Sequence, residues 1–342
     1  MNSVERVQAV LNKKIPDRVP VFEWAIDKPV IEAICPGGTL FDVVEELDLD
    51  AVVISQTETK EWIDEDTYVD EWGVVKQDTG YSYSMVKESP IKEAKDLLKY
   101  KPPAPDASYR FDRLKEAIKR FKNKKAIIVK LRDIFSQPRD LRGFENLLMD
   151  FLINPELVND LMEISIDYFS ALAEKAAELG VDVIHTGDDI ADRRGPLVSP
   201  EVFEKIIYPK FKKITENFKS TGKPYIKHTD GNLNPILDLL VNSGIDVLDP
   251  IDPSAGMDIG EIKKTYGKII GIKGNVDCAG VLQYGTPEDV REETKMCLKV
   301  ASPGGGHILS SSNSIHHGVP AENFIAMVNT VKDFGYYPIQ IE

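Results

Sequence analysis

Cysteine is scarce in this chain, and the few residues present are scattered. The three cysteines, Cys35, Cys278 and Cys297, lie far apart and none belongs to a CxxC pair. An odd, scattered set does not make a disulfide framework, and the lack of a CxxC pair argues against a structural zinc finger. We therefore expect reduced thiols. Cys297 falls within a helical pattern over residues 290–300 and is predicted to be buried.

Long apolar runs and excess positive charge are also missing. No apolar run approaches the roughly 18 residues of a membrane span, and the first residues lack the apolar core of a signal peptide. Asp and Glu number 56 against 42 Lys and Arg, which leaves a net charge of -14, whereas nucleic acids require a basic surface. The sequence thus predicts a cytoplasmic protein that binds a small molecule, with neither a membrane nor a nucleic acid as partner.

The chain instead shows a regular alternation of short apolar runs with helical patterns. About eight runs read as strands, at residues 19–23, 51–55, 126–131, 181–185, 225–226, 246–249, 268–272 and 307–310. The main helices are expected at residues 3–11, 41–47, 112–122, 155–179, 200–218, 235–241, 259–266, 287–300 and 320–334. Such alternation predicts an α/β fold, a (β/α)8 TIM barrel that spans residues 1–342 as a single domain. An open doubly wound sheet would carry a Gly-rich fingerprint after its first strand, and residues 23–27 have none.

Residues 62–89 interrupt this alternation. Aromatic and β-branched residues are interleaved there with polar ones, and Gly73 and Gly80 provide turns. The pattern predicts an inserted β-meander near the barrel mouth. Such an insert could cover the mouth as a lid or join a partner surface, which leaves a homodimer open.

Polar residues follow each predicted strand, and in a barrel the carboxyl ends of all strands meet on one face. They are Glu23, Gln56, Lys130, Arg132, Asp133, His185, Asp188, Asp189, His228, Asp230, Asp249, Asp252, Lys273, Asn275, Asp277, residues 310–313, His316 and His317. Histidine and carboxylate side chains gathered in this way can bind a divalent metal or act as general acid and base. The sequence therefore predicts one functional site at this face.

The stretch His228-Thr229-Asp230 is the strongest candidate, because two functional side chains lie two residues apart at one strand end. Both can reach one metal ion, and a third ligand could come from Glu23, Asp188, Asp189 or His316.

Several of the other residues also have plain structural interpretations. His185 lies inside an apolar strand and reads as a hydrogen-bonded core histidine. Asp249 and Asp252 each precede a proline and read as turn residues. Turns or solvated loops could equally explain three adjacent pairs, Asp188-Asp189, Arg193-Arg194 and His316-His317.

Motifs along nearly the whole chain share their order and spacing with a known family. They lie at residues 18–21 (RVPV), 187–190 (GDDI), 195–201 (GPLVSPE), 228–232 (HTDGN), 271–277 (GIKGNVD), 285–288 (GTPE), 310–313 (SSSN) and 319–323 (VPAEN). With these motifs the chain resembles the uroporphyrinogen decarboxylase superfamily, which also contains corrinoid-linked methyltransferases. The resemblance implies a (β/α)8 barrel as well.

The resemblance is to the methyltransferase branch rather than to the decarboxylases. Decarboxylases of this superfamily have an Arg-rich first-strand loop and an Asp after the second strand, where this chain reads FEWAI at residues 22–26 and ISQTE at 54–58. The acidic Glu23 would repel a substrate with many carboxylates. The methyltransferase branch holds zinc with a His-x-Cys pair and a distant Cys, where this chain has His228-x-Asp230 and PGGG at 303–306. Imidazole and carboxylate ligands are harder than the thiolates that this chain lacks, yet they also suit zinc as a Lewis acid.

The resemblance thus implies a metal-dependent methyltransferase that moves a methyl group between a small methylated substrate, such as an O-methyl compound, and a corrinoid protein. Zinc or another divalent metal would be bound by His228, Asp230 and His316, and a separate protein would carry the corrinoid. The other expected site residues are Asp188, Asp189 and Glu23 for catalysis, and Arg132, Arg193, Asn275, Asn313 and His317 for substrate binding.

Two alternatives remain open at this point. One is a cofactor-free decarboxylase of a tetrapyrrole or another carboxylated ring, with Arg132, Arg193 and Arg194 binding its carboxylates. The other is a non-catalytic protein that binds a tetrapyrrole or another small ligand.

Overall fold

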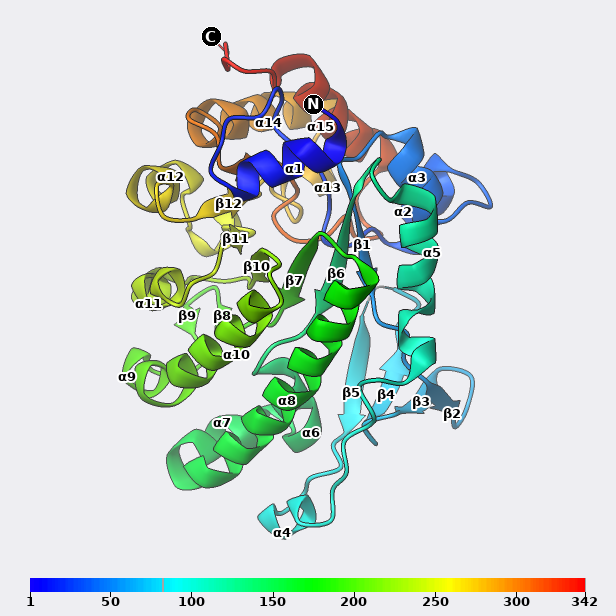
Figure 1. Ribbon diagram of the computed structural model, residues 1–342, viewed down its shortest axis with the longest axis vertical. Coiled ribbons are helices and arrows are strands. Elements are labelled where there is room, and N and C mark those ends of the chain that lie inside the picture. The colour runs from blue at the N-terminus through cyan, green and yellow to red at the C-terminus, as the bar shows by residue number, and fades with distance from the viewer. Residues whose placement is uncertain (82, 342) are drawn as a thin grey trace.

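A curled parallel sheet forms the centre of the computed structural model, which describes residues 1–81 and 83–341 (Figure 1). Ser82, inside the predicted insert, and Glu342, the last residue of the predicted domain, lie outside the described residues. The sheet has seven strands in the order β1-β6-β7-β10-β11-β12-β13. They are β1 (Ala51–Ser55), β6 (Ala126–Leu131), β7 (Val183–Gly187), β10 (Tyr225–His228), β11 (Val247–Asp249), β12 (Gly271–Lys273) and β13 (His307–Ile308). The predicted α/β fold with a curled parallel sheet is confirmed in this alternation of parallel strands with helices.

The first strand of the prediction, at residues 19–23, is not a regular strand. Its backbone still connects the two edge strands, because Val21 O accepts a hydrogen bond from Asp50 N and Pro20 O accepts one from Leu309 N, at 2.8 and 2.9 Å. Val21 and Leu309 form an isolated parallel bridge. Pro20 has no N–H to donate, which prevents a continuous ladder here.

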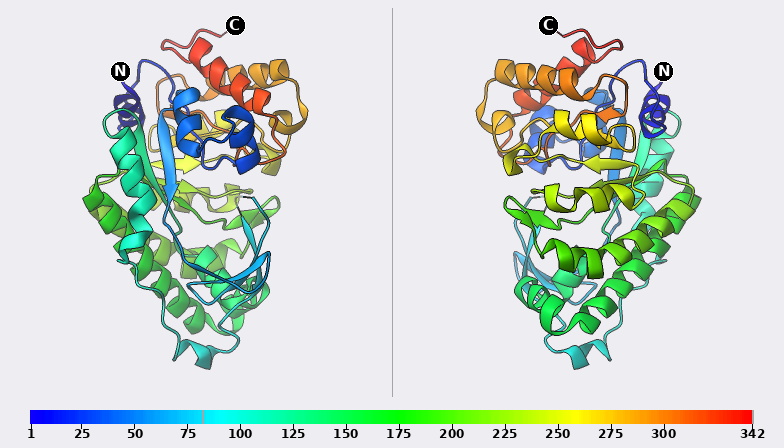
Figure 2. Two further views of the ribbon diagram at one scale, coloured as in Figure 1. Left: turned by 90° about the vertical axis from the view of Figure 1, so that its right-hand side faces the viewer. Right: turned by 90° about the vertical axis from the view of Figure 1, so that its left-hand side faces the viewer.

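The helices pack around this sheet (Figures 1 and 2). The α-helices are α1 (Ser3–Leu11), α2 (Lys28–Ile34), α3 (Leu40–Glu46), α4 (Ala94–Leu97), α5 (Asp112–Phe121), α6 (Ser136–Arg142), α7 (Phe144–Ile153), α8 (Pro155–Leu179), α9 (Pro200–Val202), α10 (Tyr208–Ser220), α11 (Leu237–Asn242), α12 (Ile259–Tyr266), α13 (Val281–Tyr284), α14 (Pro287–Ala301) and α15 (Ala321–Phe334). Short 3-10 helices lie at Ser108–Phe111, Asn234–Ile236 and Pro253–Ala255, and Phe203–Ile207 is π-helical.

The boundaries of the longest helix, α8, follow from its end residues. Pro155 takes its first position, where a missing N–H costs nothing, and Gly180 ends it in the left-handed conformation at φ 100°. The sequence did not predict α6 and α7, which follow β6 directly. Those two helices position several residues of the barrel mouth.

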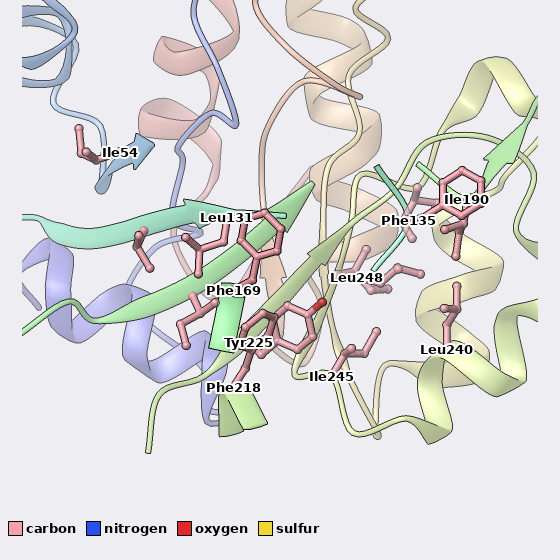
Figure 3. Close-up of a cluster of buried hydrophobic side chains, with 14 of the residues drawn as sticks. Ile54, Leu131, Phe135, Phe169, Ile190, Phe218, Tyr225, Leu240, Ile245 and Leu248 are labelled. Carbon is pink, nitrogen blue, oxygen red and sulfur yellow. The ribbon is translucent and has the colours of Figure 1, made fainter. Parts of the chain in front are cut away.

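Alternate strand residues contribute to two different apolar clusters, because successive side chains point to opposite faces. Val52 and Ile54 of β1 belong to the large cluster between sheet and helices, part of which Figure 3 shows. Ala51 and Val53 belong to a smaller cluster inside the sheet's curve, together with Val7 of α1. α1 therefore covers one end of the sheet's interior and leaves the other end for the site.

The insert forms a separate four-stranded antiparallel sheet in the order β2-β3-β4-β5. Its strands are β2 (Lys60–Trp62), β3 (Thr67–Asp70), β4 (Val75–Asp78) and β5 (Ser84–Glu88). It lies at the end of the molecule opposite both termini (Figure 1). Trp72, between β3 and β4, packs against Tyr168 and Phe169 of α8, with ring centroids 4.5 and 6.4 Å away. These contacts hold the insert against the barrel.

None of the helices within residues 1–81 and 83–341 combines the length and apolar character that a membrane crossing requires. Cys297 is buried in α14, as predicted, and all three cysteines are free thiols.

Candidate functional site

Two histidines and one aspartate meet at the carboxyl end of the sheet. Oδ2 of Asp249, the last residue of β11, lies 2.9 Å from Nε2 of His185 in β7 and 2.7 Å from Nδ1 of His228 in β10. β10 lies between β7 and β11, and its register places His228 beside Asp249. All three side chains are buried. Each imidazole thus turns one nitrogen to the same carboxylate, which fixes the orientation of both rings.

Neighbouring charges set the protonation of this group. Lys273 of β12 donates a hydrogen bond to Oδ1 of Asp249 at 2.9 Å. Burial alone would raise the pKa of Asp249, but Lys273 and His228 hold it well below its usual range. Burial lowers the pKa of His185 to about 3, so that ring is neutral. Burial would lower the pKa of His228 too, but Asp249 and Asp230 raise it to about 9.

The second nitrogen of His228 faces two more carboxylates. Its Nε2 lies 3.7 Å from Oδ1 of Asp230, and ligand atoms of His228, Asp230 and Asp189 all lie within 4.8 Å of one another. Oδ1 of Asp230 is buried and has no hydrogen-bond partner among the described residues, whereas Oδ2 accepts from Nδ2 of Asn313. A buried carboxylate oxygen without a partner is costly, and burial raises the pKa of this carboxyl.

An imidazole nitrogen with carboxylate oxygens in this arrangement fits a divalent cation. Asp249, on the far side of His228, would orient the ring in the way that carboxylates orient metal-binding histidines. His185, His228 and Asp249 also lie within 4.8 Å of one another. Their atoms hydrogen-bond to each other, so this second group orients His228 rather than offering free ligands.

Trp24 lies directly against this cluster. Its ring stacks on His228 with centroids 4.7 Å apart and meets His185 edge-on at 4.5 Å. The amino group of Lys130, in β6, lies 3.7 Å from a Trp24 ring centroid. Gly187, at the end of β7, makes room for the indole, because a Cβ there would lie 2.2 Å from Cζ2 of Trp24. Burial lowers the pKa of Lys130 to about 7, and Arg132 adds to this effect.

The cluster opens into a cavity of about 620 Å³ that the insert helps to enclose. His228, Asp230, Asp189, Asn313 and Trp24 line it together with residues of the insert such as Tyr68, Lys76 and Tyr83. A second cavity of about 290 Å³ adjoins it and shares Trp24, Lys28, Ser55, Tyr81 and Lys130 as lining residues. The site is therefore accessible to a small molecule.

The structure places two of the predicted catalytic residues in different roles. Both oxygens of Asp188 accept backbone hydrogen bonds, from Phe135 N at 2.6 Å and from Ser136 N at the start of α6. Both oxygens of Glu23 accept from Ser311, at 2.9 Å from its N and 2.6 Å from its Oγ. Burial raises the pKa of Glu23 to about 7, although Lys273 and Ser311 act against the shift. Of the predicted catalytic residues, Asp189 lies beside His228 and Asp230.

The two loop histidines lie apart from His228. Nε2 of His316 is 2.9 Å from the carbonyl oxygen of Cys278, and its Nδ1 accepts from Gly318 N at 3.1 Å. His316 is in neither group of metal-ligand candidates within the described residues. His317 is exposed, stacks on Tyr81 of the insert at 3.7 Å, and lies 3.4 Å from Asp27.

Some of the predicted substrate-binding residues line the larger cavity, and others do not. Asn313 and Arg132 line the larger cavity. Arg132 donates to Asp140 of α6 at 2.8 Å. Asn275 is buried and donates to Ile251 O at 2.8 Å, which gives it a structural role. Arg193 is exposed outside both cavities and does not join Arg132 in a clamp.

Sequence reasoning gave no functional role to three residues of this site. Asp249 was interpreted as a turn residue, and that interpretation is wrong, because it is fully buried in β11 and contacts both histidines. Its position at a strand end was a usable signal. Trp24 directly follows Glu23, which was predicted as a catalytic residue, but Trp24 itself was not assigned to the site. Lys130 was noted only as a strand-end residue. Nothing in the sequence indicated that the two side chains touch.

Comparisons with known proteins agree with this architecture. The family model for uroporphyrinogen decarboxylase (URO-D) matches residues 74–334. The chain belongs to this family. Methylcobamide:CoM methyltransferase MtbA of Methanosarcina mazei is 28% identical over 273 residues, which cover 77% of this chain and 75% of that protein. Uroporphyrinogen decarboxylase of Carboxydothermus hydrogenoformans is 32% identical over 136 residues, which cover 40% of this chain and 37% of that protein.

A methylated-thiol--coenzyme M methyltransferase of Methanosarcina mazei is also similar. It is 24% identical over 218 residues, 64% of this chain, and the match spans 56% of that protein's own length. Among solved structures, a methyltransferase from Methanosarcina mazei superposes with a TM-score of 0.81 at 21% identity, covering 98% of this chain and 99% of that chain. At this identity the superposition shows a shared fold over almost the full length.

Proposed function

We propose that this member of the uroporphyrinogen decarboxylase family is a metal-dependent methyltransferase, which moves a methyl group between a small methylated substrate and a corrinoid protein. The observation that carries the proposal is the arrangement around His228. One nitrogen is held by Asp249, and the other faces a partnerless oxygen of Asp230 with Asp189 close by. Two relatives named as methyltransferases support the same reaction class.

His228, Asp230 and Asp189 would hold the metal in this proposal, with zinc as the first candidate. When bound, a divalent cation supplies Lewis acidity to the heteroatom that carries the methyl group. The cation would replace the proton on His228, because metal ligands bind in their deprotonated form. Oxygen and nitrogen ligands make the site harder than a thiolate site, which favours an oxygen-bound methyl group over a sulfur-bound one.

The residues around the metal ligands would orient the substrate. Asp249 fixes the imidazole of His228, and Trp24 packs flat against the same ring. Asn313 donates a hydrogen bond to Oδ2 of Asp230, and Oδ1 of Asp230 faces His228. On transfer, the bonding electron pair would stay with the heteroatom, and a reduced corrinoid on the partner protein would supply the electron pair for the new bond to the methyl group. The MtbA relative is named for a methylcobamide, which supports a corrinoid as the partner in methyl transfer. In this proposal a separate protein would carry the corrinoid.

The decarboxylase alternative is less well supported by the same geometry. It requires Arg132, Arg193 and Arg194 to bind substrate carboxylates together. Arg132 is paired with Asp140, and Arg194 is exposed and paired with Asp192.

Elemental analysis tests the metal site directly. Wild type, His228→Ala, Asp230→Ala and His316→Ala proteins would be dialysed against metal-free buffer, reloaded with zinc and dialysed again. We expect near-stoichiometric zinc in wild type and in His316→Ala, and loss of zinc from the other two variants. His316→Ala is the matched control, because it removes the loop histidine that the sequence had suggested as a ligand.

Wild type without metal after reloading would refute the proposed site. Zinc lost from His316→Ala as well as from the other two variants would show that His316 is a ligand, as predicted from the sequence. With metal in place, methylation of a reduced corrinoid protein by O-methyl donors, followed by absorption spectroscopy, would test the reaction itself.

A further inference from the structure

The smaller cavity beside the site combines apolar walls with positive charge. Its fifteen described lining residues include seven aliphatic side chains from the first part of the chain, Ile26, Ile31, Leu40, Val44, Leu49, Ala51 and Val53. Three cations line it as well, Lys28, Arg113 and Lys130. Glu23 is the carboxylate among its described lining residues, and both of its oxygens already accept hydrogen bonds from Ser311.

These cations differ from the others at the barrel mouth in having no acidic partner. In the larger cavity Lys60 pairs with Asp78 at 3.5 Å, and both Lys76 and Arg132 pair with Asp140, at 3.4 and 2.8 Å. Lys130 forms no hydrogen bond or ion pair with any described residue, and its charge lies against the face of Trp24. Lys28 and Arg113 also have no carboxylate partner within residues 1–81 and 83–341. In a protein with a net charge of -14, such cations form an unpaired positive group.

Lys130 lies where the two cavities join, since it lines both of them. It also lies near the reaction site, because Trp24 contacts both its amino group and the ring of His228. Burial without a partner disfavours its charged form, which is the reason for its lowered pKa. A bound anion would favour the charged form again. The pairing of a buried cation with an anionic ligand is a common source of both affinity and orientation.

We propose that the substrate is an organic anion with an apolar body, whose anionic group is bound by Lys130 and whose apolar part occupies the smaller cavity. Because Lys130 lines both cavities, an anionic group bound to it would place that end of the substrate in the larger cavity, which contains His228. The inference rests on the proposed function only in assigning a methyl group to that end. The binding itself requires neither metal nor corrinoid.

Calorimetric titration of the purified protein with hexanoate, hexanamide and acetate tests this proposal. Hexanamide has the shape of hexanoate without its charge, and acetate has the charge without the apolar body. We expect hexanoate to bind roughly tenfold or more tightly than either, which corresponds to one hydrogen bond to a charged group. Lys130→Met should remove the preference for hexanoate over hexanamide, while Lys130→Arg should keep most of it.

Lys212→Met is the matched control, because Lys212 is exposed on α10 and lines neither cavity. It should bind hexanoate like wild type. Equal binding of hexanoate and hexanamide to wild type, or no binding of hexanoate, would overturn the proposal even if Lys130→Met fails to fold. Zinc content would be measured on the same samples. For wild type, equal binding of hexanoate and hexanamide with normal zinc content refutes this inference alone. Missing zinc in wild type with a clear preference for hexanoate refutes the proposed function alone.

Discussion

At the scale of single residues, the site depends on how closely Trp24 can approach the sheet. The indole stacks on His228, and it lies so close to β7 that a Cβ on Gly187 would be 2.2 Å from its Cζ2. Gly187 is therefore required for space, since its backbone has no left-handed conformation. The glycine controls the position of a tryptophan that precedes it by more than 160 residues (24 against 187).

We predict that Gly187→Ala displaces Trp24 and weakens both folding and zinc binding. Overpacking of this kind costs about 1–3 kcal/mol of unfolding free energy. Urea unfolding and zinc content of the variant would measure the two effects. In a Trp24→Phe background, which lacks the outer ring of the indole, the same substitution should cost less. An equal cost in both backgrounds would show that the crowding is not with Trp24.

At the scale of secondary-structure elements, one buried aspartate joins three parts of the barrel mouth. Asp140 of α6 accepts from Arg132 after β6 at 2.8 Å, pairs with Lys76 of β4 at 3.4 Å and contacts Arg139 at 3.1 Å. The insert is thereby connected to the helix that follows β6. Burial alone would raise the pKa of Asp140, but these three cations hold it well below its usual range.

We predict that Asp140→Asn destabilises the protein by about 3 kcal/mol at neutral pH, because it removes the buried carboxylate that pairs with Arg132, Arg139 and Lys76, of which Lys76 keeps Asp70 as a second partner. A depressed pKa stabilises the fold above the unfolded value of about 4 and loses this contribution as the pH falls below it. The difference between wild type and variant should therefore be largest near pH 7 and shrink below pH 4. Denaturant unfolding across this range measures it. A difference that is constant with pH would contradict the ionic role of Asp140.

At the scale of the whole molecule, the proposed metal ligands come from two different strand ends. Asp189 follows β7, while His228 and Asp230 lie at the end of β10, and Asp249 of β11 orients the ring of His228. A ligand that binds only the folded chain raises its stability by mass action. Zinc should therefore stabilise the entire fold.

We predict that zinc at a hundredfold excess over its dissociation constant adds about 2.7 kcal/mol to the unfolding free energy of wild type. The melting temperature, followed by calorimetry, should rise with zinc for wild type and His316→Ala but stay unchanged for His228→Ala. A chelator should reverse the rise. The same increase in His228→Ala would mean that zinc binds elsewhere.

The sequence by itself determined the alternation of strands and helices, because buried parallel strands are continuous apolar runs and helices have their own period. It placed β1, β6, α1, α8 and α12 at their observed boundaries. It also located the site at the strand ends and selected His228 with Asp230, since two functional groups at one strand end are a local signal. A family-level resemblance could be recognised on the same basis.

Only the tertiary structure decided which distant side chains meet. The sequence offered Glu23, Asp188, Asp189 and His316 as third ligands, and the predicted set contained His316. The fold directs Glu23 to Ser311, Asp188 to the start of α6 and His316 to a carbonyl oxygen, and brings Asp189 to His228. Strand register and hydrogen-bond partners far along the chain make these choices. A pattern of neighbouring residues contains no information about either, because both depend on how the sheet curls.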